Sequence, residues 1–167
     1  MLSFGTKNPR RNLPAHVRNK RGEILFQSSF LKVWETTLVE AGIGGNQFEL
    51  PGFGIADYLW VNNKGSMDAF EFKMGDWKRG FTQACRYRNY ANRSILVLPQ
   101  SIAKRALVFL ADFQATGVGL VSFDPTTQSI EKHYWPEASE PLNRKAHASA
   151  FSILKGKRKF RQLTKAA

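Results

Sequence analysis

The chain has 167 residues and a formal net charge of +12, from 25 lysine and arginine residues against 13 acidic residues. This length predicts one domain with a sizeable core, and 13 phenylalanines with 4 tryptophans exclude a disordered chain. The single cysteine, Cys85, excludes an intrachain disulfide and a zinc site built from cysteines. Because no apolar run has the length of a membrane span and the N-terminus lacks the apolar stretch of a signal peptide, we expect a cytoplasmic protein with no membrane partner.

Residues 1–22 are predicted to form a basic N-terminal arm, because they contain Pro9, Pro14 and little periodicity. This arm holds six basic residues and no acid, and residues 141–167 hold eight basic residues and no acid. Such ends can neutralise phosphates and give a salt-dependent affinity for nucleic acid. A purely solubilising role is the alternative. The candidate phosphate contacts in these ends are Arg10, Arg11, Lys157, Arg158 and Lys159.

A helix is predicted over residues 23–41, where apolar side chains recur at helical spacing. Gly42, Gly44 and Gly45 predict the end of this helix. Glu35 lies at the edge of the apolar stripe. From there its carboxylate can face an active site as a further ligand, or it can simply reach solvent.

Two strands joined by a short turn are the most informative part of the chain. Residues 55–61 and 69–74 are each predicted to form a strand, and the Asn- and Gly-containing segment 62–66 predicts a hairpin between them. A further short strand is predicted over residues 46–50. Side chains alternate between faces along a strand, so Phe70, Phe72 and Met74 are predicted to face the core.

Three charged residues interrupt these apolar strands. Asp57 lies on the first strand, and Glu71 and Lys73 share one face of the second, about 7 Å apart. If the turn centres on Lys64, Asp57 lies opposite Glu71 at about 5 Å. A bound cation would relieve the repulsion of the two acids, and Mg²⁺ prefers a few carboxylates together with water and phosphate oxygens. Ordinary charges on a half-exposed hairpin are the alternative, although charges are seldom buried without a partner.

The rest of the chain alternates between helices and strands. A loop is predicted over residues 75–80, helices over 81–92 and 102–115, with Gly117 as the stop of the second, and strands over 94–98, 118–123 and 130–134. Alternation from residue 69 to 123 predicts parallel pairing with right-handed crossovers, next to the antiparallel hairpin. We therefore expect an α/β fold with a mixed central sheet flanked by helices. Residues 23–135 would form the core domain, and residues 136–167 a basic C-terminal extension with a modest helical pattern.

One face of the predicted helix 81–92 is unusually polar. Gln83, Arg86, Tyr87 and Tyr90 share it at i, i+3, i+4, i+7 spacing. Gln83 could point toward the metal site, and Arg86 or Tyr87 toward a phosphate. A tyrosine-lined packing face is the alternative. The basic residues just before this helix, Lys78 and Arg79, are further candidates for nucleic-acid contact.

The order of these elements resembles that of the PD-(D/E)xK nuclease superfamily, which includes many restriction endonucleases, Holliday-junction resolvases and repair or phage nucleases. A helix with Glu35, a strand with Asp57, a strand with Glu71-x-Lys73 and a helix with Gln83 follow one another, so the resemblance covers residues 23–123. Ala56 stands where the family often has proline. The resemblance implies a restriction-endonuclease-like αβββαβ core.

The resemblance also implies roles for these residues. Asp57 and Glu71 would bind the metal with the help of the Phe72 backbone carbonyl. Lys73 would orient or activate the attacking water and stabilise the developing charge. Glu35 would be an accessory acid and Gln83 would position water. The implied cofactor is Mg²⁺, for which Mn²⁺ can substitute, and the number of ions is left open.

Three functions are therefore open. The first is a Mg²⁺-dependent DNA endonuclease that acts on duplex or branched DNA, with a homodimer expected only because double-strand cutting needs two sites. The second is a non-catalytic nucleic-acid-binding module of the same fold. The third is a basic RNA-associated protein in which the Asp57, Glu71 and Lys73 set is incidental. His16, His133 and His147 are scattered and do not form the histidine cluster of another nuclease class.

Overall fold

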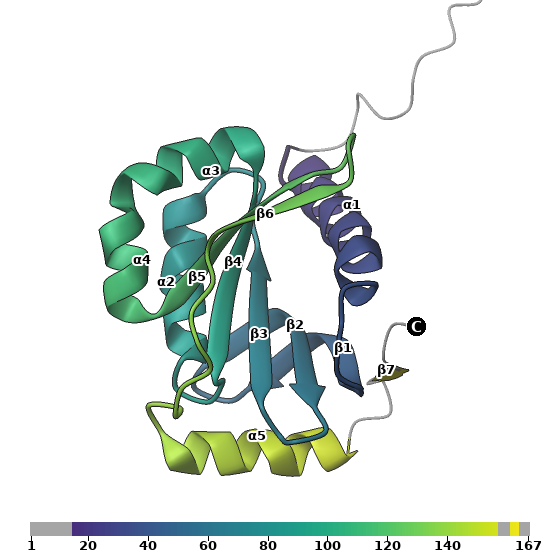
Figure 1. The fold of residues 1–167 in the computed structure, drawn as a ribbon, viewed down its shortest axis with the longest axis vertical. Coiled ribbons are helices and arrows are strands. Elements are labelled where there is room, and N and C mark those ends of the chain that lie inside the picture. The colour runs from purple at the N-terminus through teal and green to yellow at the C-terminus, as the bar shows by residue number, and fades with distance from the viewer. Residues whose placement is uncertain (1–14, 157–160, 164–167) are drawn as a thin grey trace, which may run out of the picture.

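The computed structural model describes residues 15–156 and 161–163, with residues 15–18 and 161–163 described by their backbone only. It is an α/β fold in which helices flank a mixed sheet (Figure 1). The elements in chain order are α1 (Ala15–Glu35), β1 (Gly42–Leu50), β2 (Gly54–Asn62), β3 (Met67–Phe72), α2 (Trp77–Tyr87), β4 (Arg93–Pro99), α3 (Gln100–Ala106), the short 3-10 helix η2 (Leu107–Phe109), α4 (Leu110–Thr116), β5 (Val118–Asp124), β6 (Ser129–Tyr134), α5 (Arg144–Gly156) and β7 (Arg161–Leu163).

The strands lie in the order β6-β5-β4-β3-β2-β1-β7. The pairs β1–β2, β2–β3, β5–β6 and β1–β7 are antiparallel, whereas β3–β4 and β4–β5 are parallel. This arrangement confirms the predicted mixed sheet. The parallel pairs are those joined through a helix, because a parallel connection must cross over the face of the sheet.

The β2–β3 hairpin has the register that the sequence predicts. Tyr58 pairs with Phe70 and Val61 pairs with Met67, so the turn is centred on Lys64. One further step in this register places Asp57 beside Glu71, at the point where the ladder ends. The hairpin therefore brings the two acids to the same end of the sheet.

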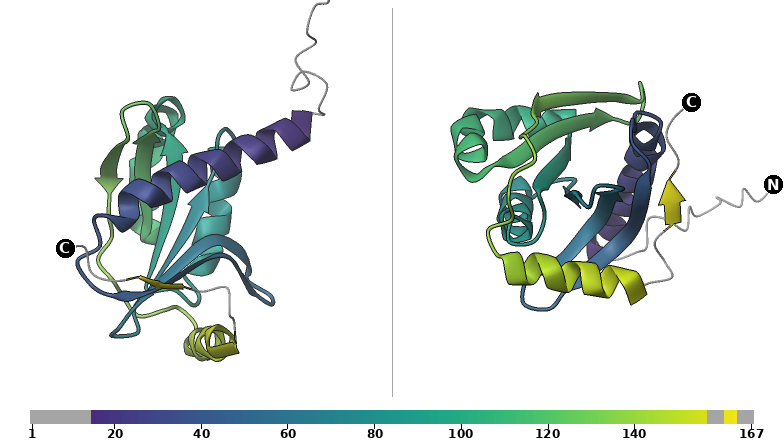
Figure 2. Two further views of the ribbon diagram at one scale, coloured as in Figure 1. Left: turned by 90° about the vertical axis from the view of Figure 1, so that its right-hand side faces the viewer. Right: turned by 60° about the horizontal axis from the view of Figure 1, so that its bottom comes forward.

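Apolar residues cover both faces of the sheet. On one face Phe30 and Trp34 of α1 pack against Phe70 and Phe72, with the rings of Phe30 and Phe72 5.3 Å apart. On the other face α2, α3, α4 and α5 cover odd-numbered positions of β2 and β3, such as Leu59 and Ala69, and the even-numbered positions Leu96 and Leu98 of β4. Figure 2 shows α1 along one face and α5 across one end of the sheet. Ala146, Ala150 and Leu154 of α5 belong to the same cluster of buried residues as Phe48 of β1.

The first helix lies earlier in the chain than its apolar stripe predicts. It begins at Ala15, within the predicted arm, and ends at Glu35 rather than near residue 41. Gly42 and Gly44 are not a helix stop but part of β1. A Cβ at Gly42 would collide with the Val61 carbonyl oxygen and crowd the indole of Trp60. Here the tertiary packing of β1 against β2 decides the role of the glycines.

Two further boundaries differ from the prediction. Helix α2 begins at Trp77 rather than at residue 81, because the Asp76 side chain accepts a hydrogen bond from the Arg79 N–H and caps it. The single helix expected over 102–115 is divided at Phe109, whose φ of −107° and ψ of 23° leave the helical range while its ring packs on Trp77 at 5.3 Å. Gly117 ends α4 with a left-handed φ of 67°, as predicted.

Met74 is a further correction. Strand β3 ends at Phe72, so Met74 lies beyond the sheet, and 40 % of its surface is exposed. Within the ranges that the structure describes, no helix has the length and hydropathy to cross a membrane.

Candidate active site

The ends of β2 and β3 bring the three predicted site residues together. Lys73 Nζ lies 2.8 Å from Glu71 Oε1, which confirms that the two side chains share a face. Glu71 is buried at 1 % exposure, and 16 % of the Lys73 side chain is exposed. A buried carboxylate therefore lies beneath a partly exposed ammonium group.

Tyr87 of α2 holds the other oxygen of Glu71. The Tyr87 hydroxyl lies 2.6 Å from Glu71 Oε2 and 2.6 Å from the carbonyl oxygen of Ile55. Burial raises the pKa of Glu71 to about 7, the negative charge of Asp57 adds to this, and Lys73 and Tyr87 oppose it. Glu71 is consequently partly protonated near neutral pH, where an exposed glutamate is almost fully ionised.

Asp57 is fixed by hydrogen bonds from three directions. Its Oδ2 accepts from the Phe72 N–H at 2.9 Å, and its Oδ1 from Gln47 Nε2 at 3.3 Å. Its backbone carbonyl accepts from Gln27 Nε2 of α1 at 3.0 Å. Burial raises the pKa of Asp57, while the Phe72 N–H and the charge of Lys73 lower it. The carboxylate is thus held in one place by groups that favour its charged form.

The sheet is irregular where Asp57 lies. Gln47, opposite Asp57 in β1, has a left-handed φ of 55°, and the ladder continues on either side of it with Asn46↔Tyr58 and Phe48↔Ala56. A non-glycine residue in this region is uncommon and costs on the order of 1–3 kcal/mol. Such strained backbone is concentrated at functional sites in proteins.

The Phe72 backbone also faces Asp57. Its N–H donates to Asp57 rather than to a strand carbonyl, whereas the next N–H, of Lys73, points the other way and donates to Val97 of β4. The N–H and C=O of a strand residue project toward the same neighbouring strand. The Phe72 carbonyl is therefore expected on the Asp57 side, where the predicted metal ligand would have to lie.

Helix α2 approaches Lys73 closely because residue 80 is glycine. A Cβ at Gly80 would lie 2.6 Å from Lys73 Cγ. Burial lowers the pKa of Lys73, but Glu71, Glu23 and Asp57 together raise it by more, so the amine is protonated at neutral pH. Gln83 lies on α2 between Gly80 and Tyr87, at a spacing that shares their face. Its Oε1 is buried and has no hydrogen-bond partner in the part of the chain that the structure describes.

A groove runs past Asp57 and Lys73. A hollow of about 450 Å³ is bounded by α1 and the β1–β2 hairpin and reaches Asp57. An adjoining hollow of about 540 Å³ reaches Lys73 and Arg79. Lys20 and Glu23 of α1 line both hollows, so these form one continuous groove with three basic side chains along it.

Glu23, rather than Glu35, is the acid that α1 brings to this site. The charge of Glu23 contributes to the raised pKa of Asp57, and its Oε1 accepts from the Met74 N–H at 3.4 Å. Glu35 lies about three helical turns farther along α1. There it accepts a hydrogen bond from the Tyr58 hydroxyl at 3.3 Å, on the opposite face of the sheet from Glu71. The expected accessory role of Glu35 is therefore corrected, because the helix starts and docks differently from its apolar stripe.

The candidate nucleic-acid contacts are placed differently from one another. Arg79 is exposed in the groove and Arg86 is exposed on α2. Lys78 Nζ lies over the rings of Trp77 and Phe109 at 5.9 and 5.7 Å. Tyr87 is a correction, since it is buried and holds Glu71 instead of facing a phosphate. Arg10, Arg11, Lys157, Arg158 and Lys159 lie outside the described residues.

Sequence reasoning missed Glu23, Gln27 and Gln47. The i, i+4 spacing of Glu23 and Gln27 could have indicated a polar patch on α1, but nothing in the sequence marks Gln47. Within residues 19–156, no three or more His, Cys, Asp or Glu side chains are grouped to hold one metal ion. The metal ligands that the sequence predicts are two carboxylates and a backbone carbonyl. This metal site stays a prediction.

Comparisons with known proteins give no family. No protein-family model and no curated protein match the chain. Among solved structures the chain is similar to the SPO1766 protein of unknown function from Silicibacter pomeroyi, with 18% sequence identity over 88% of this chain and 90% of that chain. The TM-score of that pair is 0.45.

Proposed function

We propose that this chain is a metal-dependent nuclease that hydrolyses DNA phosphodiester bonds as an endonuclease. The observation that carries the proposal is the meeting of Asp57, Glu71 and Lys73 where β2 and β3 end, beside a groove lined by basic residues. Two carboxylates whose pKa values are both raised by burial, that of Glu71 also by the charge of Asp57, are a costly arrangement for stability alone. Groups with perturbed pKa values in a cleft are characteristic of active sites.

The residues fit a divalent ion. Asp57, Glu71 and the Phe72 carbonyl supply hard oxygen donors of the kind that Mg²⁺ and Mn²⁺ prefer. A positive ion would also offset the repulsion that raises the pKa of Glu71. When bound, the ion supplies Lewis-acid polarisation of the phosphate and a water of lowered pKa.

The protein side chains then have separate tasks. Lys73 is protonated, so it stabilises the negative charge that develops on the phosphate oxygens rather than removing a proton. Lys20 and Arg79 lie along the groove, where they can hold the phosphates on either side of the cut bond. Gln83 offers a buried acceptor to a water, and Glu23 takes the accessory role.

The fold supports the same proposal. The order α1, β1, β2, β3, α2, β4, with a β1–β2–β3 meander and a parallel β3–β4 pair, is compatible with the αβββαβ core that the resemblance implies. Duplex or branched DNA would lie along the groove, and a homodimer would place two such sites on opposite strands.

One observation favours the second candidate, a non-catalytic nucleic-acid-binding module. Glu71 is buried, and its two oxygens already contact Lys73 and Tyr87. In a nuclease Glu71 would share its carboxylate between Lys73 and the metal ion. In a binding module this ion pair persists.

A cleavage assay separates the two. Linear, supercoiled and branched DNA are incubated with and without Mg²⁺ or Mn²⁺, using wild type, Lys73→Ala, Asp57→Ala and the exposed-lysine control Lys104→Ala. We expect metal-dependent cutting by wild type and the control, and a loss of at least about 100-fold in the two site variants. DNA binding without cutting by wild type supports the binding module, and equal cutting by all four proteins refutes the site.

The accessory acid is tested in the same assay. Glu23→Gln is expected to reduce cutting, because the charge of Glu23 acts on the pKa of Asp57. Glu35→Gln should leave cutting near the wild-type rate, because Glu35 lies away from the site and accepts a hydrogen bond from Tyr58. The reverse order of effects would restore the role that the sequence predicted for Glu35.

A further inference from the structure

A second cavity lies away from the groove and shares no lining residue with it. It has a volume of about 410 Å³ and is formed where the end of α1 meets β2, β3, β4 and the segment after β6. We call it the tryptophan pocket and define it by six of its lining residues: Trp34, Trp60, Asp68, Arg93, Lys132 and Trp135. Three of the 4 tryptophans of the chain are therefore gathered in one cavity.

The cavity contains a layered arrangement of planar and charged groups. Arg93 Nε donates to Asp68 Oδ1 at 2.8 Å, which fixes the guanidinium. The Arg93 guanidinium carbon then lies 5.6 Å from the centre of the Trp135 ring, and Lys132 Nζ lies 4.4 Å from it. Asp68 is buried at 1 % exposure, whereas 21 % of the Arg93 side chain is exposed. A flat cation is thus held against an indole ring by a buried carboxylate.

The charges of the cavity favour an anion. Its lining includes the cations Lys64, Arg93 and Lys132 and the acids Glu40 and Asp68. Both acids are already in ion pairs, Glu40 with Lys64 and Asp68 with Arg93. Among the lining residues that the structure describes, Lys132 is in no ion pair and no carboxylate is left unpaired for a cationic ligand.

Two buried polar atoms in the lining have no hydrogen-bond partner among the residues that the structure describes. They are Trp60 Nε1 and Ser66 Oγ. Buried polar groups in proteins nearly always have a partner, and an unmade hydrogen bond costs about 1–3 kcal/mol. Both atoms are covered by neighbouring groups and do not themselves contact the cavity, whose volume is in the usual range for small-ligand sites.

We propose that the tryptophan pocket binds a nucleotide. The base lies against the Arg93 and Trp135 layer, because nucleobases stack on aromatic rings and on guanidinium planes. The phosphate contacts Lys132, whose Nζ lies 4.4 Å from the centre of the Trp135 ring. The ligand is either a free nucleotide or one unpaired nucleotide of a strand, and its binding does not depend on the proposed nuclease activity.

Nucleotide binding is measured by the quenching of tryptophan fluorescence. Wild-type protein is titrated with dAMP, with a short single-stranded oligodeoxyadenylate, and with ribose 5-phosphate, which has no base. We expect saturable quenching by the first two and none by the third. Tighter binding of the oligonucleotide assigns the site to a strand, and equal binding per nucleotide assigns it to the free ligand.

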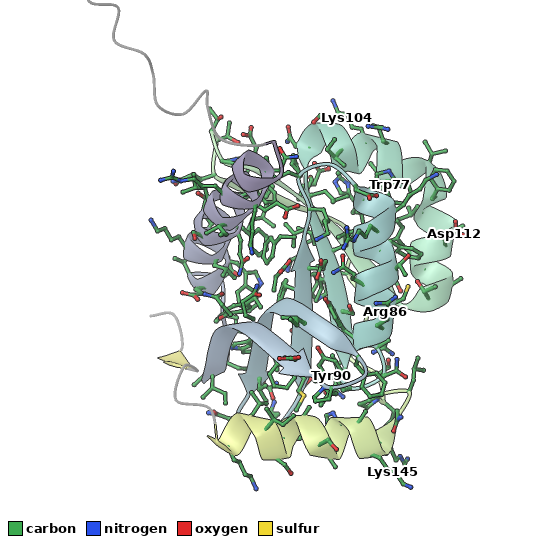
Figure 3. The ribbon with its side chains drawn as sticks, turned by 180° about the vertical axis from the view of Figure 1, so that it is seen from behind. Trp77, Arg86, Tyr90, Lys104, Asp112 and Lys145 are labelled. Atoms are coloured by element: carbon green, nitrogen blue, oxygen red, sulfur yellow. The ribbon has the colours of Figure 1, made fainter. Side chains whose placement is uncertain are left out.

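Variants locate the ligand. Lys132 is exposed on β6, so Lys132→Ala should fold normally and raise the Kd about tenfold or more, the effect of losing a contact to a charged group. Arg93→Lys keeps the positive charge but removes the planar guanidinium on which the base would stack, so it should weaken dAMP binding as well. Lys145→Ala is the matched control on α5, on a different element from the pocket (Figure 3).

The site is also separated from the groove by Asp57→Asn, which should bind dAMP as wild type does. The proposal is overturned if wild type shows no saturable quenching, or if Lys132→Ala binds as tightly as Lys145→Ala. It is also overturned if Asp57→Asn abolishes binding, since the nucleotide would then lie in the groove. If Asp57→Asn loses DNA cleavage but still binds dAMP, the proposed nuclease site in the groove is affected and the tryptophan pocket is not.

Discussion

Glu71→Gln tests whether burying the ionised Glu71 carboxylate lowers the free energy of unfolding. In the folded chain burial raises the pKa of Glu71 from 4.5 to about 7. Between these values the folded form binds more protons than the unfolded form. The stability contributed by protonated Glu71 is therefore present at low pH and is lost as the pH rises toward and through 7. For this shift the linkage relation gives a loss of about 2.5 kcal/mol between pH 5 and pH 8.

The glutamine variant has no such titration. Its free energy of unfolding relative to wild type should therefore increase by about 2–3 kcal/mol from pH 5 to pH 8, whatever the constant difference between a protonated glutamic acid and a glutamine at this position. The measurement is urea unfolding followed by circular dichroism at several pH values and fixed ionic strength. Glu137→Gln, at an exposed position, is the matched control. A difference between Glu71→Gln and wild type that stays constant with pH would refute the reasoning.

Three further predictions concern the same site. Tyr87→Phe removes a hydrogen bond that lowers the pKa of Glu71, so NMR titration of the Glu71 carboxyl should give a higher pKa, and urea unfolding should show a loss of about 1–2 kcal/mol; an unchanged pKa contradicts this. Gly80→Ala introduces a methyl group 2.6 Å from Lys73 Cγ, so we expect a loss of about 1–3 kcal/mol in unfolding and a lower cleavage rate, and an unchanged rate would show that Lys73 need not keep its place. Adding millimolar Mg²⁺ should raise the Tm of wild type by calorimetry but not that of Asp57→Asn, and equal shifts would place the ion elsewhere.

The hairpin and the faces of its strands could be predicted from the sequence. Alternation along β2 and β3 assigned Glu71 and Lys73 to one face and Phe70 to the other, and the short turn fixed the register that brings Asp57 beside Glu71. These features depend on neighbouring residues and on a turn of few residues, so local rules determine them. The parallel pairing of β3 with β4 followed in the same way from the helix between them.

The surroundings of these residues were decided by tertiary packing. The position of α1 on the sheet selects Glu23 instead of Glu35, and the approach of α2 buries Tyr87 against Glu71. The left-handed backbone of Gln47, opposite Asp57, has no signal in the sequence. Amphipathic periodicity shows which side of a helix is buried but not how far along the sheet the helix lies, and many contacts distant in sequence settle that position together. The sequence by itself therefore determined which charges meet, and only the tertiary structure decided which neighbours set their pKa values.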